Sequence, residues 1–234
     1  MGIKSIKADS SQPKPGLFLF PELSTLHPSG FPDSRFDLEL SLIQSGKKAV
    51  AGVDEAGRGP LAGPVVSAAV ILDPENLNWS LNDSKKLSES QRNELFIWIK
   101  ANAASFGIGM ASVEEIDRLN ILQATVLSMN RAIENLSTKA DFILVDGNYG
   151  IPGRPFVKAI VKGDALSLSI SAASILAKVT RDQIMTDLHR EFPVYGFNRN
   201  KGYGTLEHRK AMKTHGQCPH HRKSFKLKSD PEDR

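Results

Sequence analysis

The sequence predicts an α/β domain in which helices cover a mixed β-sheet. Two observations indicate this class. Apolar runs of strand length lie close together in the first half of the chain, and later runs alternate with stretches whose apolar residues recur every three or four positions. Strands that first cluster and then alternate with helices are typical of a layered α/β domain with a mixed sheet. The 234 residues are enough for one such domain with a sizeable core and appendages.

Local signals justify the elements in order. Asp33 or Ser34 is placed to cap a short first helix. Capping boxes, Ser-x-x-Gln beginning at Ser88 and Ser-x-x-Glu beginning at Ser112, open the next two helices. We expect strands at residues 49–53, 65–72, 105–111, 142–146 and 156–161, and helices at 34–46, 88–99, 112–133, 166–191 and 206–213.

The chain divides by composition. Residues 1–33 carry five prolines and no periodicity, which predicts a flexible extension. Residues 34–192 hold the predicted strands and the long helices. Residues 193–228 form a region rich in Gly, Pro and basic residues, and residues 229–234 are a short tail.

The overall composition is that of an ordinary globular protein, with 40% hydrophobic and 24% charged residues. A formal net charge of +4 suggests a polyanionic partner. Cys218 is the single cysteine, which excludes a disulfide framework within the chain and fits a reducing compartment. No apolar run is long enough to span a bilayer. We therefore expect a cytoplasmic monomer without a membrane partner.

Four carboxylates end or follow predicted strands. Asp54 and Glu55 end the first strand, Asp146 ends the fourth, and Asp164 follows the fifth. In open α/β sheets, sites gather where adjacent strands end. Carboxylates that converge there raise one another's pKa unless a cation intervenes. Oxygen ligands suit Mg²⁺ or Mn²⁺, and two such ions bridged by carboxylates are a known device for phosphoryl transfer.

Each of these carboxylates also has a structural interpretation. Asp, Gly and Pro in the segment 54–60 are ordinary turn residues. Asp146 is placed to start a turn, and Asp164 to cap the helix that follows it. The sequence leaves both interpretations open. Asp182 is assigned a structural role, because it lies one helical turn after Lys178, where an ion pair is expected.

Seven short motifs stand in order along the chain: Gly52-Val53-Asp54-Glu55-Ala56-Gly57-Arg58-Gly59-Pro60, Asp83-Ser84-Lys85-Lys86-Leu87-Ser88, Val145-Asp146-Gly147, Lys162-Gly163-Asp164, Ala172-Ala173-Ser174-Ile175-Leu176-Ala177-Lys178-Val179-Thr180-Arg181-Asp182, Lys201-Gly202-Tyr203-Gly204-Thr205 and His221-Arg222-x-Ser224-Phe225. Each motif is weak by itself. Together, from about Ala49 to Phe225, they closely resemble bacterial ribonuclease HII.

The resemblance implies a ribonuclease H-like fold, with a mixed five-stranded sheet flanked by helices and a small helical, basic C-terminal region. Residues 34–192 would be the catalytic domain, and residues 193–228 would bind substrate. The implied reaction is endonucleolytic hydrolysis of the RNA strand in RNA–DNA hybrids and at single ribonucleotides embedded in duplex DNA, with 3′-hydroxyl and 5′-phosphate ends. Mn²⁺ or Mg²⁺ is the implied cofactor. The residues that match the family's catalytic, metal-binding carboxylates are Asp54, Glu55, Asp146 and Asp164.

The resemblance also implies substrate contacts. The backbone of Gly57, Arg58 and Gly59 would approach the 2′-hydroxyl, which distinguishes RNA from DNA. Tyr203 would pack on a deoxyribose near the RNA–DNA junction, with core packing as the alternative. The other expected substrate-binding residues are Lys85, Lys86, Lys178, Arg181 and Lys201.

The C-terminal region is strongly basic. Nine Lys or Arg residues and a single acidic residue lie between Arg199 and Lys228, which predicts a phosphate-binding surface. For residues 226–234 we prefer a solvated charged tail. A non-catalytic nucleic-acid-binding module would explain the basic charge but not the four strand-end carboxylates. A structural zinc site is disfavoured, because a single thiolate among irregularly spaced histidines does not match one; its residues would be His215, Cys218, His220 and His221.

Overall fold

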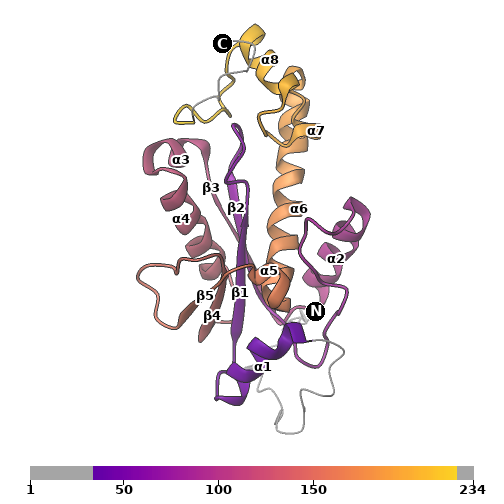
Figure 1. The fold of residues 1–234 in the computed structure, drawn as a ribbon, viewed down its shortest axis with the longest axis vertical. Coiled ribbons are helices and arrows are strands. Elements are labelled where there is room, and N and C mark those ends of the chain that lie inside the picture. Colours follow the sequence, from indigo (N-terminus) through magenta and orange to yellow (C-terminus); the bar gives the residue numbers. More distant parts are fainter. Residues whose placement is uncertain (1–33, 226–234) are drawn as a thin grey trace, which may run out of the picture.

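The computed structural model describes residues 34–225, in which one β-sheet stands between two layers of helices (Figure 1). The expected extension at residues 1–33 and the tail at 229–234 lie outside the described residues. The five strands are arranged in the order β3-β2-β1-β4-β5. They are β1 (Val50–Ala56), β2 (Val65–Ile71), β3 (Ser105–Ala111), β4 (Phe142–Asp146) and β5 (Val157–Ile160).

The sheet is mixed, as the sequence predicts. Strand β2 pairs antiparallel with β1 and with β3, whereas β4 pairs parallel with β1, and β5 pairs parallel with β4. All seven residues of β2 are buried. Strands that are apolar on both faces are expected where helices cover both sides of a sheet.

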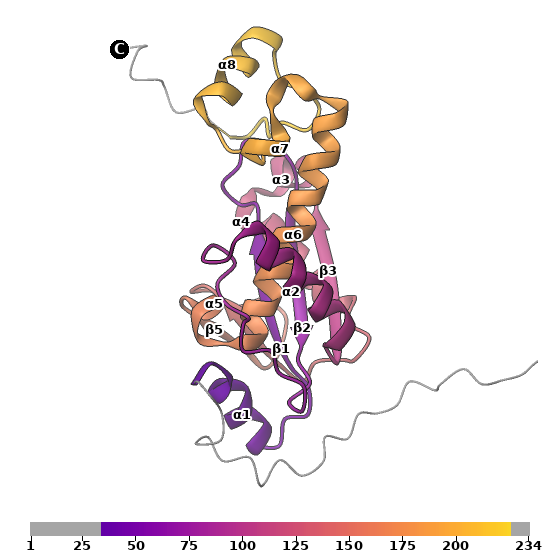
Figure 2. The ribbon, with the colours of Figure 1, turned by 90° about the vertical axis from the view of Figure 1, so that its right-hand side faces the viewer.

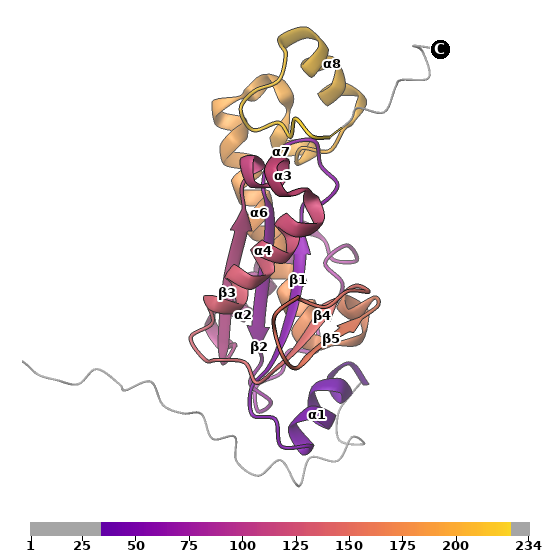
Figure 3. The same ribbon diagram turned by 90° about the vertical axis from the view of Figure 1, so that its left-hand side faces the viewer.

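Helices do cover both sides. Figure 2 shows α2 (Glu89–Asn102) and α6 (Leu168–Glu191) in front of one face of the sheet. Figure 3 shows α3 (Val113–Leu119) and α4 (Ile121–Glu134) in front of the other. Both predicted capping boxes, which begin α2 and α3, are confirmed.

The first helix, α1 (Asp37–Gln44), is fixed to the start of α6 by a buried carboxyl group. Glu39 Oε1 accepts hydrogen bonds from Ser167 Oγ at 2.5 Å, from Ser169 Oγ at 2.6 Å and from Ser169 N at 3.0 Å. Burial raises the pKa of Glu39, and these hydrogen bonds act against that shift.

Helix α6 packs directly on β1 because Gly52 has no side chain. A Cβ at this position would lie 2.1 Å from the carbonyl carbon of Ser169, a distance that real Cβ atoms essentially never show. The glycine therefore sets how closely α6 approaches the strand that carries Asp54.

One of the predicted helices is interrupted. The expected single helix over residues 112–133 is wrong, because Asn120 adopts a positive φ of 71° between α3 and α4. Its side chain then accepts hydrogen bonds from the backbone N–H groups of Leu122 and Gln123, which caps α4. With a ψ of 163°, Asn120 lies outside the left-handed helical region, and this backbone conformation is costly for a residue that carries a side chain.

The expected helix over residues 166–191 is confirmed as α6, which begins two residues later than predicted and ends at Glu191. The short α5 (Gly163–Leu166) ends at Ser167, whose extended backbone and side-chain oxygen cap α6. Of the two predicted caps of the first helix, Ser34 is wrong, because a 3-10 turn (Ser34–Phe36) precedes α1, which has no side-chain cap. Asp33, the other candidate cap, lies outside the described residues.

The C-terminal residues form a small helical lobe beside the last turns of α6 (Figure 1). It comprises a 3-10 turn (Pro193–Tyr195), α7 (Phe197–Asn200) and α8 (Leu206–His215), of which α7 was not predicted. Tyr195, Phe197 and Met212 pack there in one apolar cluster. Within residues 34–225, no helix has the length and apolar character needed to cross a membrane.

Candidate active site

Two of the four predicted carboxylates occupy neighbouring positions on parallel strands. Val53 of β1 pairs with Val145 of β4, and the next residues along the two strands are Asp54 and Asp146. Strand β1 continues past Glu55, so the interpretation of Asp54 and Glu55 as turn residues is wrong. The parallel register brings their two strands to one edge of the sheet at the same level.

Asp164 approaches the same edge from α5. The N–H of Gly163 donates a 2.7 Å hydrogen bond to Asp146 Oδ1, which ties the start of α5 to the end of β4. Ser171 Oγ on α6 donates to the Asp164 carbonyl at 2.7 Å. Since Ser167 is the cap of α6, the interpretation of Asp164 as that cap is wrong.

The carboxylates affect one another's charge. Burial raises the pKa of Asp54 well above its ordinary value, and the charges of Glu55 and Asp146 raise it further. Burial and then the charge of Asp146 also raise the pKa of Asp164. Groups that repel in this way are stabilised in their charged forms by a cation placed among them.

One buried oxygen of this group has no protein partner. Glu55 Oε1 accepts from Arg58 Nη1 at 3.3 Å, but Glu55 Oε2 is buried and unpaired within residues 34–225. A buried carboxylate oxygen without a partner is costly and calls for an ion, a water or a ligand. Among those same residues, no three His, Cys, Asp or Glu side chains are already gathered closely enough to hold an ion. The carboxylates would therefore have to draw together around one.

Lys85 reaches the carboxylates from the loop before α2. Its Nζ lies 3.4 Å from Asp164 Oδ2, while its side chain is 80% exposed. The Oγ atoms of Ser84 and Ser174 are 3.0 Å apart and join this loop to α6. Lys86, the next residue, is exposed. Both ammonium groups are thus accessible to a polyanion that approaches the carboxylates.

The loop after β1 lies against Tyr203. A Cβ on Gly59 would be 3.5 Å from Tyr203 Cε1, so the aromatic ring borders the glycine directly. Tyr203 is 48% exposed, and the alternative of core packing is therefore wrong. Arg58, between the two glycines of the motif, points its guanidinium group toward Glu55. The loop therefore connects the tyrosine with the carboxylate cluster.

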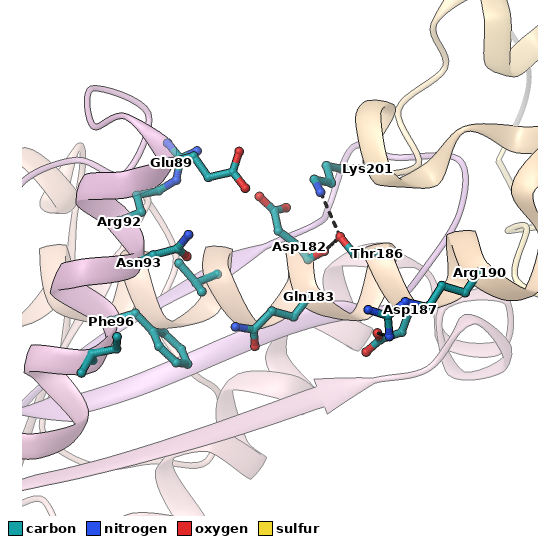
Figure 4. Close-up of a pocket in the computed structure, with 12 residues that line it drawn as sticks. Glu89, Arg92, Asn93, Phe96, Asp182, Gln183, Thr186, Asp187, Arg190 and Lys201 are labelled. Carbon is teal, nitrogen blue, oxygen red and sulfur yellow. Dashed lines mark hydrogen bonds and ion pairs between the residues drawn. The ribbon is translucent and has the colours of Figure 1, made fainter.

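Lys201, one of the predicted basic contacts, lines a groove of about 570 Å³ between α2 and α6 (Figure 4). Lys201 Nζ donates to Thr186 Oγ1 at 3.3 Å at one end of the groove. Lys178 forms the expected ion pair with Asp182, at 2.8 Å. Both acidic and basic side chains line the groove, and none of the four carboxylates does.

Arg181 does not reach the surface. It is 1% exposed, and its guanidinium nitrogens donate to the carbonyl oxygens of Pro64 at 3.0 Å, Lys201 at 2.9 Å and Ala62 at 3.1 Å. The prediction of a direct substrate contact by Arg181 is therefore corrected, because the side chain is used inside the protein to join two loops.

Tyr149 is a residue of the site that the sequence analysis missed. Its hydroxyl is buried and unpaired among the described residues, and the Arg58 guanidinium lies 5.5 Å from the centre of its ring. Burial, followed by the charge of Glu55, raises the pKa of Tyr149 to about 12. The one available signal was its position, three residues after Asp146.

Two buried histidines support the Tyr203 loop. His208 Nδ1 lies 2.9 Å from the Tyr203 carbonyl oxygen, which can only accept, so Nδ1 donates. His208 Nε2 then accepts from His221 Nε2 at 3.0 Å, and His221 Nδ1 accepts from the Cys218 N–H at 3.0 Å. The ring nitrogens are thus occupied by protein partners, which argues against the disfavoured zinc site.

Comparisons with known proteins agree with this geometry. The family model described as ribonuclease HII matches residues 51–228. The chain is 59% identical to ribonuclease HII 1 of Methylibium petroleiphilum over 75% of this chain and 88% of the relative. It is 56% identical to ribonuclease HII of Wolbachia pipientis subsp. Culex pipiens, over 83% and 96% of the two chains.

Solved structures show the same fold. The ribonuclease H2 of Pyrococcus horikoshii superimposes with a TM-score of 0.64 at 29% identity, over 76% of this chain and 94% of that one. The ribonuclease HII of Archaeoglobus fulgidus, solved in complex with PCNA, superimposes with a TM-score of 0.61 at 27% identity, over 80% and 99%. With a ribonuclease H-like fold and relatives of this similarity, the chain belongs to the ribonuclease HII family and is a metal-dependent endoribonuclease that acts on RNA–DNA hybrids.

Proposed function

We propose that Asp54, Glu55, Asp146 and Asp164 together hold two divalent ions, Mg²⁺ or Mn²⁺, and that the enzyme also cuts at single ribonucleotides within duplex DNA. The observation that carries the proposal is the meeting of β1 and β4. Their parallel register sets Asp54 and Asp146 next to each other, and burial followed by the charges of Glu55 and Asp146 raises the pKa of Asp54.

The side chains fit divalent ions in chemistry and charge. All four are carboxylates, the ligands that hard cations prefer. The unpaired Glu55 Oε2 is an available ligand atom, and burial, followed by the charges of neighbouring carboxylates, raises the pKa values of Asp54 and Asp164, so a cation would stabilise their charged forms. When bound, two divalent ions would supply an activated water and would offset the charge that develops on the phosphate.

The protein's own groups prepare the reaction. Strand β1 and the Asp146–Gly163 hydrogen bond fix the carboxylates. Lys85 is held beside Asp164 by an exposed ion pair, which a substrate phosphate can replace. Hydrolysis adds the water oxygen to phosphorus and breaks the bond to the 3′ oxygen, which takes up a proton. The products are a 3′-hydroxyl and a 5′-phosphate, with the cut on the 5′ side of the ribonucleotide.

Selection of the ribonucleotide falls to the loop after β1. With no side chains at Gly57 and Gly59, the backbone N–H groups of this loop can approach a 2′-hydroxyl closely. The exposed ring of Tyr203, in contact with the Gly59 position, is placed to pack on the neighbouring deoxyribose. An aromatic ring there favours a sugar without a 2′-hydroxyl group.

The basic residues complete the substrate surface. We assign phosphate contacts to Lys85, Lys86, Lys178 and Lys201. We assign substrate binding to the basic region of residues 193–228, which follows the catalytic domain at 34–192 in the chain. A sequence pI near 9.1 supports binding to a polyanion. We further propose that the enzyme is a cytoplasmic monomer that removes ribonucleotides from DNA as a repair activity.

The test is cleavage and binding by two carboxylate variants. Asp54→Asn and Asp146→Asn should abolish cleavage of a hybrid and of a duplex with one ribonucleotide, while binding to both stays within about threefold of wild type. Asp187→Asn is the matched control, because Asp187 is exposed on α6 and pairs with Arg190; it should cleave normally. Turnover by either carboxylate variant at the wild-type rate would refute the assignment.

A further inference from the structure

The segment from Gly57 to Pro64, which joins β1 to β2, is held from inside the protein by Arg222. This side chain is 1% exposed. Its Nη2 donates to the Gly57 carbonyl oxygen at 2.5 Å, and its Nη1 donates to the Arg58 carbonyl oxygen at 2.9 Å. It also donates from Nε and Nη2 to the Gly63 carbonyl oxygen, at 2.9 Å and 2.8 Å. One buried guanidinium group therefore fixes both ends of the segment.

Arg181 holds the same segment from α6. It donates to Ala62 and Pro64, and its third hydrogen bond, to Lys201, joins the segment to the loop that carries Tyr203. The backbone passes so close to Arg181 that a Cβ on Gly57 would lie 2.1 Å from its Nε. Gly57 also has a φ of +99°, which side chains rarely adopt.

These hydrogen bonds determine which way the peptide groups face. In a trans peptide the C=O and the following N–H point in opposite directions, and the described chain has no cis peptide. Because the carbonyls of Gly57 and Arg58 point inward to Arg222, the N–H groups of Arg58 and Gly59 point outward. Gly59 is exposed and lies beside Tyr203.

We propose that Arg222, supported by Arg181, is a positioning residue that aims the N–H groups of Arg58 and Gly59 at the ribose of the substrate. The inference rests on the proposed role of this loop in reading the 2′-hydroxyl. Arg222 does not touch the substrate, and it acts only through the two peptide groups that it orients.

The segment from Gly57 to Pro64 does not need the hydrogen bonds of Arg222 merely to stay in place. Backbone hydrogen bonds from Leu61 to Gly202, at 2.8 Å, and from Gly63 to His220, at 2.9 Å, already hold the middle of the segment. Two buried guanidinium groups close to each other cost free energy, because both lose solvent and their charges repel. Burial, and then the charge of Arg181, lowers the pKa of Arg222 to about 9. What Arg222 adds is control of the first two peptide groups, which are the ones beside the carboxylate cluster.

Amide hydrogen exchange of the wild-type protein tests the orientation without any variant. The N–H groups of Leu61 and Gly63 donate hydrogen bonds to backbone carbonyls, which protects them from solvent. Their amide hydrogens should therefore exchange slowly. Those of Arg58 and Gly59 should exchange at least about tenfold faster and should be protected when a duplex with one ribonucleotide binds. Slow exchange at Arg58 and Gly59 in the free protein would overturn the inference.

A binding experiment tests the consequence. In an Asp54→Asn background, which is expected to bind without cutting, the affinity for a duplex with one ribonucleotide is compared with that for the same all-DNA duplex. Adding Arg222→Lys keeps a positive charge but loses the forked donor geometry. The preference for the ribonucleotide should fall about tenfold, equal to about 1.4 kcal/mol, while the all-DNA affinity stays within about twofold.

The matched control is Arg131→Lys, because Arg131 also donates to a backbone carbonyl, that of Met110, but its partners are Met110 and Glu115 and not residues of the Gly57–Pro64 segment. It should leave the preference intact. A general loss of folded protein would weaken binding to both duplexes equally. If Arg222→Lys gave this result, the positioning role would be overturned. An unchanged preference for the ribonucleotide would overturn it as well. Equal affinity for both duplexes already in the Asp54→Asn background would instead refute the proposed sugar reading, and the inference with it.

Discussion

Acidification should destabilise this protein through His221, which lies in the buried hydrogen-bond chain below the Tyr203 loop. Burial, followed by the charge of His208, lowers the pKa of His221 from 6.5 to about 4. The unfolded chain therefore takes up a proton on this histidine below about pH 6.5, whereas the folded protein does so only near pH 4. The stability contributed by the neutral ring is fully present above the unfolded pKa and is lost as the pH falls through this window.

The magnitude follows from the two pKa values. Between pH 7 and pH 5, the difference in proton binding lowers the free energy of unfolding by about 2 kcal/mol. A variant that cannot titrate, His221→Gln, should lose this part of the pH dependence. His208, whose pKa burial also lowers, would add to the effect in the same direction.

The assay is urea unfolding, followed by far-UV circular dichroism, at pH 7 and pH 5. The fall in unfolding free energy between the two pH values should be about 2 kcal/mol larger in wild type than in His221→Gln. His215→Gln, at the exposed end of α8, should behave as wild type. An equal fall in wild type and His221→Gln, or an NMR titration of His221 with a midpoint near 6.5, would refute the reasoning.

Three further predictions concern the site and the core. Tyr203→Ala should weaken cleavage at a single ribonucleotide about tenfold but bulk hybrid binding less than threefold; equal losses in the two assays would count against a junction role. Glu39→Gln should raise the thermal midpoint at pH 8 more than at pH 5, because the raised pKa makes the ionised carboxylate costly at high pH; calorimetry that shows no pH-dependent difference would contradict this. Gly52→Ala should lower the unfolding free energy by more than about 3 kcal/mol, since its Cβ would meet the Ser169 backbone at 2.1 Å, and an unchanged denaturation curve would disprove the close approach.

The elements that the sequence predicts well are those with local signals. Five strands were expected close to their observed positions, because runs such as Phe142–Asp146 are apolar and bounded by turn residues. The capping boxes at Ser88 and Ser112 were identified because both partners of each box lie within four residues. The break at Asn120 was missed, since nothing in an amphipathic pattern signals a single residue with a positive φ.

The site was predictable to the extent that its residues stand in compact motifs. Asp54 and Glu55 share one motif, and the parallel pairing of β1 with β4 then explains how Asp146 joins them. Arg181 was misplaced because an arginine on a helix normally faces solvent, whereas here its partners are backbone carbonyls. Arg222 stands in one of the seven motifs, but no local pattern indicates its role, because it contacts Gly57, which lies 165 residues earlier in the chain.

The most direct test of the account is the cleavage of an end-labelled DNA duplex that carries one ribonucleotide, with Mg²⁺, with Mn²⁺ or with EDTA, beside the all-DNA duplex. We predict one metal-dependent cut on the 5′ side of the ribonucleotide, with a 3′-hydroxyl and a 5′-phosphate, and an intact all-DNA control. Cutting in EDTA, or cutting of the all-DNA duplex, would contradict the claim that the carboxylate cluster uses divalent ions to hydrolyse DNA strands only where a ribose marks the site.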